Sequence, residues 1–386
     1  MKAFLLAHKA EAGIFGAMLL VVLAVLAFAV TAWDDQFVVL TANGVSYPTA
    51  TVEQVLSEDL SHEEGTSRYL GSQTLMVRID SGPYQGETVE ADNSLSATHN
   101  VLGRVGGRVV IKAERQDGVT PYYSVFNYDR TPGIVAILAV FAVSMVLVGG
   151  TKGLRSLLGL AFALFVIVAF LLPALYRGIP PIAAGLAAAA VITLFSMLLL
   201  NGWSRKTLAS IASTIAGLAA AVAVYLAFTA LLNVSGFNQE SAEELIIVQQ
   251  ATGLDVQQIL FVSVLISALG AVMDMCMSIA TSLFEMKERH PEMTARQMVA
   301  SGFSIGRDMI GTMCQTLILA FTGSSLTSLL VLISYGIDFN QLLSSDYMAI
   351  EFIHSFVGGI AVILCVPITS LICARACQAQ SVSSAR

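Results

Sequence analysis

Two acidic residues lie in or beside stretches of sequence that are apolar enough to cross a membrane. Asp274 stands between Met273 and Met275, deep inside one such stretch, and Asp308 lies at the mouth of the next. A carboxylate in hydrocarbon costs roughly 2.5 to 3.5 kcal/mol on insertion scales. A chain keeps such a residue where the residue faces a partner, a cavity or an ion path. This pair is therefore the strongest indication of function in the sequence.

Polar side chains accompany Asp274 along one helical face. They recur at steps of three or four residues and comprise Ser263, Ser267, Gly270, Ser278, Thr281, Ser282 and Glu285. That spacing places them on one side of a helix, while leucine, isoleucine, valine and methionine fill the other sides. Small residues alone favour close helix packing. Packing does not explain Asp274, for which the alternatives are an ion path or an internal pair with Arg307.

The next apolar stretch repeats the pattern. Its polar face holds Arg307, Asp308, Thr312, Gln315 and Thr316. An acid in the first turn of a helix also complements the helix dipole, so a purely structural role for Asp308 stays open. The run Gly323-Ser324-Ser325 allows an unwound turn farther along this stretch.

A second candidate pair is formed by Glu351 and His354. The two residues are three positions apart and so are neighbours on a helix. Because histidine titrates near neutrality, the pair can relay protons. An ion pair at the membrane interface is the alternative.

The composition places these residues in a membrane protein of the helical kind. Of the 386 residues, 56% are hydrophobic and 12% are charged, and the mean hydropathy is +0.76. Soluble domains carry about 25% charged residues. About 20 apolar residues cross a bilayer, which predicts eight spans at Gly13–Trp33, Gly133–Gly149, Leu154–Tyr176, Pro181–Leu200, Leu208–Leu232, Gln257–Leu283, Ile310–Ser334 and Ile350–Ala374.

Basic residues set the expected orientation in a bacterial plasma membrane. With eight spans, one face holds Lys2, Lys9, Lys152, Arg155, Arg205, Lys206, Lys287, Arg289, Arg296 and Arg375, whereas the short loops of the other hold Arg177. The positive-inside rule then places both termini in the cytoplasm. Val30-Thr31-Ala32 resembles a signal-peptidase site, so cleavage of the first span is an alternative to the retained anchor that we favour.

Residues 34–131 change character and read as a small extracytoplasmic β-domain inserted between the first two spans. The runs 74–79 and 87–91 flank the turn sequence 81–86, and the runs 108–113 and 122–126 follow. Short alternating strands in under a hundred residues predict a small barrel or an OB-like fold. The expected domains are an anchor (1–33), the β-domain (34–131), a seven-helix membrane domain (132–376) and a cytoplasmic tail (377–386).

Several classes of chemistry lack their usual motifs. The sequence has no Walker A, nucleophile-elbow or HExxH pattern, so an enzyme is not expected. We interpret the segment from Glu58 to Glu64, with His62, as a solvated loop, and Cys373 and Cys377 as unpaired thiols, so no metal or other cofactor is predicted. No basic tract supports nucleic-acid binding. Pro291, between the sixth and seventh spans, could start a short helix along the inner membrane surface.

The chain resembles the YibE/F family of bacterial membrane proteins. The resemblance rests on GAVMDMCMSIA at 270–280, SIGRDMIGTM at 304–313, LILAFTGSSL at 317–326 and VPIT at 366–369. The layout of an anchor, an outer β-domain and a multispan core also fits. The family implies no established substrate. A weaker resemblance connects the segment around Asp274 to SecD/SecF export proteins and RND transporters, in which intramembrane acids carry protons.

These observations favour a membrane transporter or a proton- or cation-coupled transport component. Asp274 would be the carrier, and Arg307 and Asp308 would adjust its pKa or gate the inner mouth. Thr281, Ser282, Thr312 and Gln315 would line the route. The alternative is a non-transporting assembly or export accessory whose outer β-domain binds a protein partner. The substrate, the direction of transport and the oligomeric state are open at this point.

Overall fold

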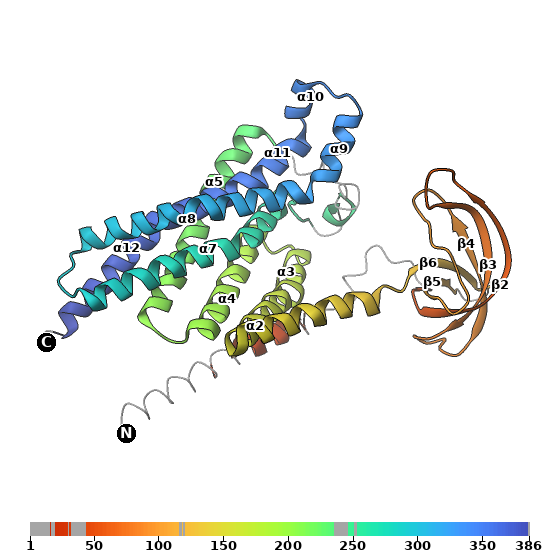
Figure 1. The fold of residues 1–386 in the computed structure, drawn as a ribbon, viewed down its shortest axis with the longest axis horizontal. Helices are drawn as coiled ribbons and strands as arrows, with labels where there is room; N and C mark the ends of the chain where they lie inside the picture. The colour runs from red at the N-terminus through yellow and green to blue at the C-terminus, as the bar shows by residue number, and fades with distance from the viewer. Residues whose placement is uncertain are drawn as a thin grey trace. The chain divides into compact units, whose positions relative to one another are not determined.

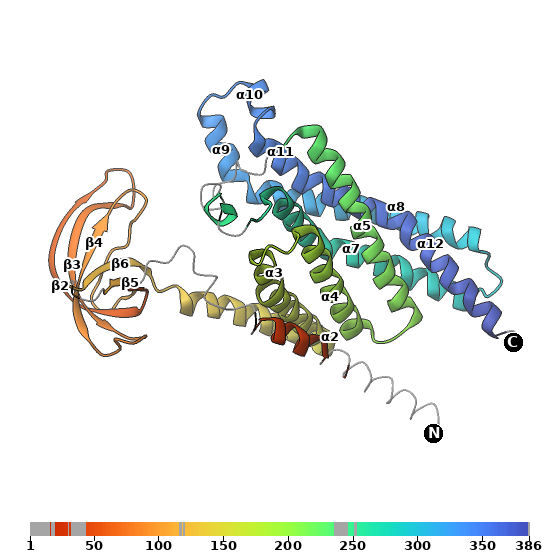
Figure 2. The same cartoon turned by 180° about the vertical axis from the view of Figure 1, so that it is seen from behind.

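The chain forms two compact units, a β-unit that also includes the start of a long helix and a helical unit (Figures 1 and 2). Val38–Leu147 make up the first, and Met1–Phe37 with Val148–Arg386 make up the second. The computed structural model describes residues 16, 20–29, 31, 44–115, 118, 120–234, 246–250 and 253–384, with the backbone alone for 379–384. Each unit is described by itself below.

The β-unit is a closed five-stranded barrel. Its strands are β2 (Thr49–His62), β3 (Tyr69–Ile79), β4 (Thr88–Leu95), β5 (Arg108–Glu114) and β6 (Tyr122–Tyr128), with the short β1 (Val45–Ser46) added beside β5. The order is β1-β5-β2-β3-β4-β6, and β5 also pairs with β6, which closes the ring. Only the β4–β6 pairing among these is parallel. This is a Greek-key barrel of the OB type, which confirms the prediction from the sequence.

The alternation of side chains explains why these segments form strands. In β3, Leu75, Val77 and Ile79 are all at most 1% exposed, and the residues between them point outward. A strand sends successive side chains to opposite faces, so one face fills the barrel core. The interpretation of the acidic segment as a loop was partly wrong. Glu58 and His62 lie in β2, which pairs with β3 along its whole length and holds them as an exposed strand face.

A buried amide pair joins the barrel wall to the loop before β5. Gln73 and Asn93 are 3% and 1% exposed, and Asn93 Nδ2 donates to Gln73 Oε1 at 3.0 Å. Gln73 Oε1 also accepts from the Gly103 amide at 2.8 Å, and Gln73 Nε2 donates to the Gly103 carbonyl at 3.2 Å. Asn93 Nδ2 also donates to the Val101 carbonyl at 2.6 Å. These bonds fix the loop that contains Val101 and Gly103 on the barrel.

We expect Gln73→Met to destabilise the barrel strongly. The change leaves the Gly103 amide without its acceptor, and Asn93 Nδ2 keeps only its bond to the Val101 carbonyl among the described contacts. The loss costs about 1–3 kcal/mol. In a domain of this size that is a fall of roughly 5–20 °C in melting temperature. The measurement is a circular dichroism melt of residues 44–130 expressed alone, which should show a strand-type spectrum. Gln54→Met, on an exposed position of β2, is the matched control and should melt like the parent. Equal melting temperatures of Gln73→Met and Gln54→Met would contradict the prediction.

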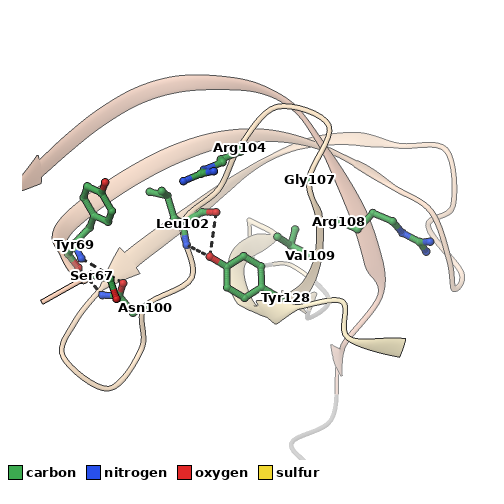
Figure 3. A pocket seen from close by; sticks show the side chains of 9 residues that line it. All are labelled: Ser67, Tyr69, Asn100, Leu102, Arg104, Gly107, Arg108, Val109 and Tyr128. Atoms are coloured by element: carbon green, nitrogen blue, oxygen red, sulfur yellow. Dashed lines mark hydrogen bonds between the residues drawn. The ribbon is translucent and has the colours of Figure 1, made fainter. Parts of the chain in front are cut away.

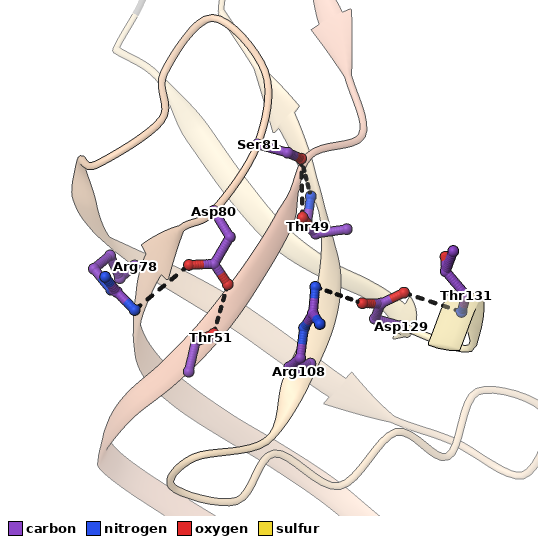
Figure 4. A network of polar contacts seen from close by, with 8 residues as sticks. All are labelled: Thr49, Thr51, Arg78, Asp80, Ser81, Arg108, Asp129 and Thr131. Atoms are coloured by element: carbon purple, nitrogen blue, oxygen red, sulfur yellow. Dashed lines mark hydrogen bonds and ion pairs between the residues drawn. The ribbon is translucent and has the colours of Figure 1, made fainter. Parts of the chain in front are cut away.

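Polar contacts connect the last barrel strand to the helix that follows it (Figure 4). Asp129, whose side chain is 1% exposed, lies 3.1 Å from Arg108 Nη2 on β5. Its second carboxylate oxygen accepts from the Thr131 amide at 3.1 Å, at the first residue of α2. A carboxylate at a helix N-terminus satisfies an amide that has no partner within the helix. The start of α2 is thereby anchored to the barrel.

The helical elements follow in chain order. They are α2 (Thr131–Val166), η2 (Ile167–Leu171), α3 (Leu172–Tyr176), α4 (Pro181–Asn201), α5 (Arg205–Leu232), α7 (Val256–Arg289), α8 (Ala295–Ser324), α9 (Leu326–Ser334), α10 (Phe339–Leu343), α11 (Asp346–Phe352), η3 (Ile353–Val357) and α12 (Gly358–Ser384). The η elements are π-helical turns.

Within the described residues, five helical stretches are long and apolar enough to cross a membrane. A sixth is counted if α8 and α9, which are bent by 54° at their junction, form one span. These stretches fit a multi-pass membrane protein. Two of the predicted spans, Gly133–Gly149 and Leu154–Tyr176, lie in one 46-residue stretch. That stretch is interrupted at Gly150, where φ 54° and ψ −134° are accessible to glycine alone without strain.

Helix α7 forms the centre of the helical unit and packs against α4, α5, α8 and α12. Its side chains Leu265, Val272 and Ile279 are at most 2% exposed. Glycines allow the neighbouring backbones to approach, because a Cβ at Gly306 of α8 would lie 2.4 Å from Val366 Cγ1 of α12. Small residues at helix contacts are typical of membrane bundles.

The turn between α7 and α8 differs from the predicted surface helix. Pro291 lies in a short turn, and α8 begins directly after Thr294. The Thr294 hydroxyl accepts from the Gln297 amide, and Gln297 Oε1 accepts from the Thr294 amide. This reciprocal capping box explains why one long helix starts here instead of a separate short one.

The basic turns gather at one end of the helical unit. The α4–α5 turn, the α7–α8 turn and the end of α12 lie together in both views of the ribbon (Figures 1 and 2). They carry Arg205, Lys287 and Arg375 among other bases. The turn after α3, at the opposite end of α4, holds Arg177, which donates to the Thr31 carbonyl.

Candidate functional site

Asp274 lies on an outer face of α7. Its side chain is exposed, although Met275 and Cys276 beside it are fully buried. Leu283, which packs in the core, is nine residues away and so about 180° around the helix. Among the described residues, no hydrogen bond or ion pair is recorded for the Asp274 carboxylate. The acid therefore faces outward from the bundle and has no internal partner of that kind.

The other polar residues of this stripe follow Asp274 along α7. Ser263, Ser267, Gly270 and Glu285 are exposed, and Ser278, Thr281 and Ser282 are half-buried. Two of the hydroxyls bond to their own helix, because Ser263 Oγ donates to the Ile259 carbonyl and Ser267 Oγ to the Val264 carbonyl. Such bonds satisfy a hydroxyl locally. The stripe is thus a face of polar and small residues with Asp274 near its middle and a second carboxylate, Glu285, toward the end of α7.

The predicted polar residues of α8 also lie on the outside. Arg307, Asp308, Thr312, Gln315 and Thr316 are all exposed. The hydroxyl of Thr312 donates to the Met309 carbonyl at 3.0 Å, and that of Thr316 donates to the Thr312 carbonyl at 2.8 Å. In the part of the chain that the structure describes, no partner is recorded for the charged groups of Arg307 and Asp308.

The structure does not bring Asp274 and Arg307 together. A Cβ on Gly302 of α8 would lie 3.1 Å from Leu283 Cδ1 of α7, which places these two residues at the same level. Asp308 is six residues from Gly302, which is about 9 Å along α8. Asp274 is nine residues from Leu283, which is about 13 Å along α7. The acids are therefore about one helical turn apart in depth. Asp274 points away from the Leu283 side of α7, so the internal ion pair with Arg307 is not formed.

Glu351 and His354 lie where α11 passes into the π-helical turn η3. Their charged groups do not form an ion pair within 4.0 Å among the described contacts. His354 Nε2 is buried without a hydrogen-bond partner, and the His354 ring centroid lies 5.8 Å from that of Phe321 on α8. π-Helical turns are frequent at functional sites. His354 thus lies in the interior between helices, and the interfacial ion pair is not seen.

A hollow in the barrel was not predicted from the sequence. Its cavity volume is about 370 Å³, and it is lined by Ser67, Tyr69, Asn100, Leu102, Arg104, Gly107, Arg108, Val109 and Tyr128 (Figure 3). Tyr128 holds one wall in place, because its hydroxyl accepts from the Leu102 amide at 2.7 Å. The lining residues come from three loops and strand ends that are far apart in sequence, so no local motif indicates the hollow.

Comparison with known protein families identifies a family for this chain. The family model described as YibE/F-like protein matches residues 137–379, which is well over half of the chain and includes α7, α8 and nearly all of α12. Neither a curated protein nor a solved structure matches. The matched region contains Asp274, Arg307 and Asp308 together with the helices that position them. The chain therefore belongs to the YibE/F-like family.

Proposed function

We propose that this chain is a multipass membrane transporter, or a proton- or cation-coupled transport component, in which Asp274 carries the ion. One observation supports this most: Asp274 lies inside a span-length apolar helix, on an exposed polar stripe, with no recorded ion-pair or hydrogen-bond partner among the described residues. A structural acid in a membrane is normally paired. An unpaired one is free to bind a proton or cation and release it.

The stripe around Asp274 supplies the route. Toward the basic end of α7, Ser278, Thr281 and Glu285 continue the same face, and Ser267 and Ser263 continue it toward the other end. Hydroxyl and carboxylate oxygens are suitable temporary ligands for a proton-carrying water or a hard cation. Asp308 would mark the inner mouth. His354, buried on another face of the bundle, is a secondary relay residue in this proposal. The chemistry is transfer of an ion rather than an enzymatic reaction.

The proposed topology has eight spans with both termini in the cytoplasm. The 46-residue stretch, divided at Gly150, counts as two spans, and the bent pair α8 and α9 counts as one. The helix Leu20–Ala29 is part of the first span. The gathering of basic turns at one end of the helical unit supports a cytoplasmic placement of that end. Residues 34–131, with the barrel, would then lie outside the bacterial plasma membrane.

Cysteine labelling tests this topology. In a background without the five native cysteines, Ser67→Cys should react with a membrane-impermeant maleimide in intact cells, because Ser67 lines the barrel hollow. Ser383→Cys, in the tail, should react only after permeabilisation. Labelling of the tail in intact cells would contradict the orientation.

The barrel hollow favours a second candidate function, that of an export or assembly accessory. In this case the barrel would bind a protein partner through the hollow near Tyr69 and Arg104. The two candidates separate genetically. A phenotype that survives Asp274→Asn and is lost in Arg104→Glu would favour the accessory function. The reverse result would favour transport.

A further inference from the structure

The outer face of α8 is polar along most of the helix, which is unusual for a membrane span. Asp308, Thr312, Thr316, Ala320 and Ser324 recur every fourth residue, and all of them are exposed. The opposite side of α8 is buried, with Gly302 and Gly306 against α12. The exposed stripe is therefore a face that no described helix of the same chain covers.

Several exposed positions on α5, α9 and α12 have the composition expected for contact with lipid. Leu226 of α5, Leu371 of α12 and Leu330 of α9 are exposed large apolar residues. The stripe of α8 differs from them by carrying a carboxylate, hydroxyls and small side chains. The hydroxyls of Thr312, Thr316 and Ser324 donate to carbonyls of their own helix. Asp308 is therefore the group of this stripe that lipid leaves without a partner.

Within this α8 stripe, Asp308 is the residue that lipid accommodates least. It lies about 9 Å along α8 beyond the level of Leu283, near the end of the apolar part of α7. Arg307 has a long side chain and can reach back toward the membrane surface. The short side chain of Asp308 cannot. A positively charged group on a neighbour at the depth of Asp308 would pair this carboxylate.

We propose that this neighbour is a second copy of the chain, packed through the outer face of α8 around a two-fold axis along the membrane normal. Such an axis places α8 and its copy side by side at equal depth. Arg307 and Asp308 differ by one residue, or about 1.5 Å, in depth. Arg307 of one copy thus meets Asp308 of the other, and the symmetry forms the second pair at once. The inference rests on the proposed membrane placement and adds the partner.

The rest of the stripe fits a close helix pair. Thr312, Thr316 and Ala320 have small side chains at the four-residue spacing that lets two membrane helices approach. Gly311 has no atom within 4 Å of the position where a Cβ would stand, so the space outside it is open to a neighbour. Gln315, on the same exposed side, can exchange amide hydrogen bonds with its copy across the axis.

Cross-linking in membranes tests the interface. Thr312→Cys and Ala320→Cys should each give a disulfide-linked dimer on mild oxidation. Ile363→Cys is the control for Thr312→Cys, because Ile363 is exposed on α12 at a depth close to that of Thr312, seven residues from the Ser370 that contacts the Gly302 position. The control and the chain with its five native cysteines should remain monomeric on the gel. Equal cross-linking of Ile363→Cys, or none at either α8 position, would overturn the proposal.

A charge exchange tests the pairing itself. In the Thr312→Cys background, Arg307→Asp should lower the cross-linked fraction about tenfold, the factor that about 1.4 kcal/mol produces in an association constant. The double variant Arg307→Asp/Asp308→Arg should restore the fraction, because it exchanges the two partners. A double variant that cross-links no better than the single one would overturn the reciprocal pair.

Mass measurement of the unmodified protein gives a result that does not depend on any variant. Light scattering in mild detergent or in nanodiscs should give the mass of two chains, and a mass of one chain in both would overturn the proposal. Asp274→Asn should leave the dimer intact. A dimer without ion flux would contradict the proposed transport and support the interface. Ion flux by a monomer would support the transport and contradict the interface.

Discussion

Replacement of Asp274 by asparagine is expected to reduce ion flux to the level of protein-free liposomes. Asparagine keeps the size and hydrogen-bonding capacity of the side chain but removes the group that binds and releases a proton or cation. Because no partner of the carboxylate is recorded among the described residues, the change breaks no known internal pair. The variant should therefore insert, purify and melt like the parent. Flux is measured in proteoliposomes at equal protein density.

Two further variants separate a titratable carrier from a merely polar position. Asp274→Glu keeps the carboxylate and should retain part of the flux. Asp338→Asn removes the acid that caps α10 and should transport like the parent. Full flux in Asp274→Asn, at matched insertion, would leave Asp274 with no role in transport.

Replacement of Gly306 by alanine is expected to lower the stability of the helical unit, whereas the same replacement at Gly323 is not. The new Cβ would lie 2.4 Å from Val366 Cγ1 and 2.6 Å from Val366 Cγ2 on α12. Both helices must separate to relieve this contact, and overpacking of this kind costs about 1–3 kcal/mol. The melting midpoint in detergent should fall by roughly 2–4 °C for each kcal/mol.

Gly323→Ala provides the matched control for this prediction. Gly323 lies in the same helix and has no atom within 4 Å of its Cβ position. Alanine also has the higher helix propensity, so the control should melt at the same temperature or slightly above it. If Gly306→Ala and Gly323→Ala melt alike, the close contact between α8 and α12 is not what stabilises this part of the unit.

The elements that the sequence predicts best are those whose pattern is local. The alternation in 74–79 and the turn residues at 81–86 predict paired strands, and the structure confirms the barrel. The uncharged run in α4 likewise predicts a span with nearly the observed ends. Gly150 shows the limit, because a glycine that turns the chain inside one long helical stretch cannot be distinguished by sequence from one that packs. The bend between α8 and α9 near Ser325 was easier to predict, because three small residues in a row indicate a break in a helix.

The candidate site was harder to predict because it depends on how the helices pack against one another. Spacing correctly places Asp274 and Ser267 on one face of α7. Spacing cannot state whether that face points toward α8 or away from the bundle, which depends on where Leu283 packs. The internal pair of Asp274 with Arg307, which the sequence leaves open as an alternative to an ion path, is therefore not formed, although each residue lies on a helix. The barrel hollow, made from separate loops around Tyr128, has no signal in any single segment.

The most direct test of transport is the decay of a pH gradient imposed across sealed proteoliposomes that contain the unmodified chain, measured with an enclosed pH-sensitive dye. The same vesicles are also loaded in turn with sodium, potassium and a divalent cation. We predict that one of these gradients decays faster than in protein-free vesicles, and that Asp274→Asn removes the difference. Decay identical to that of protein-free vesicles for every gradient, with the protein shown to be folded and inserted, would contradict the proposed function.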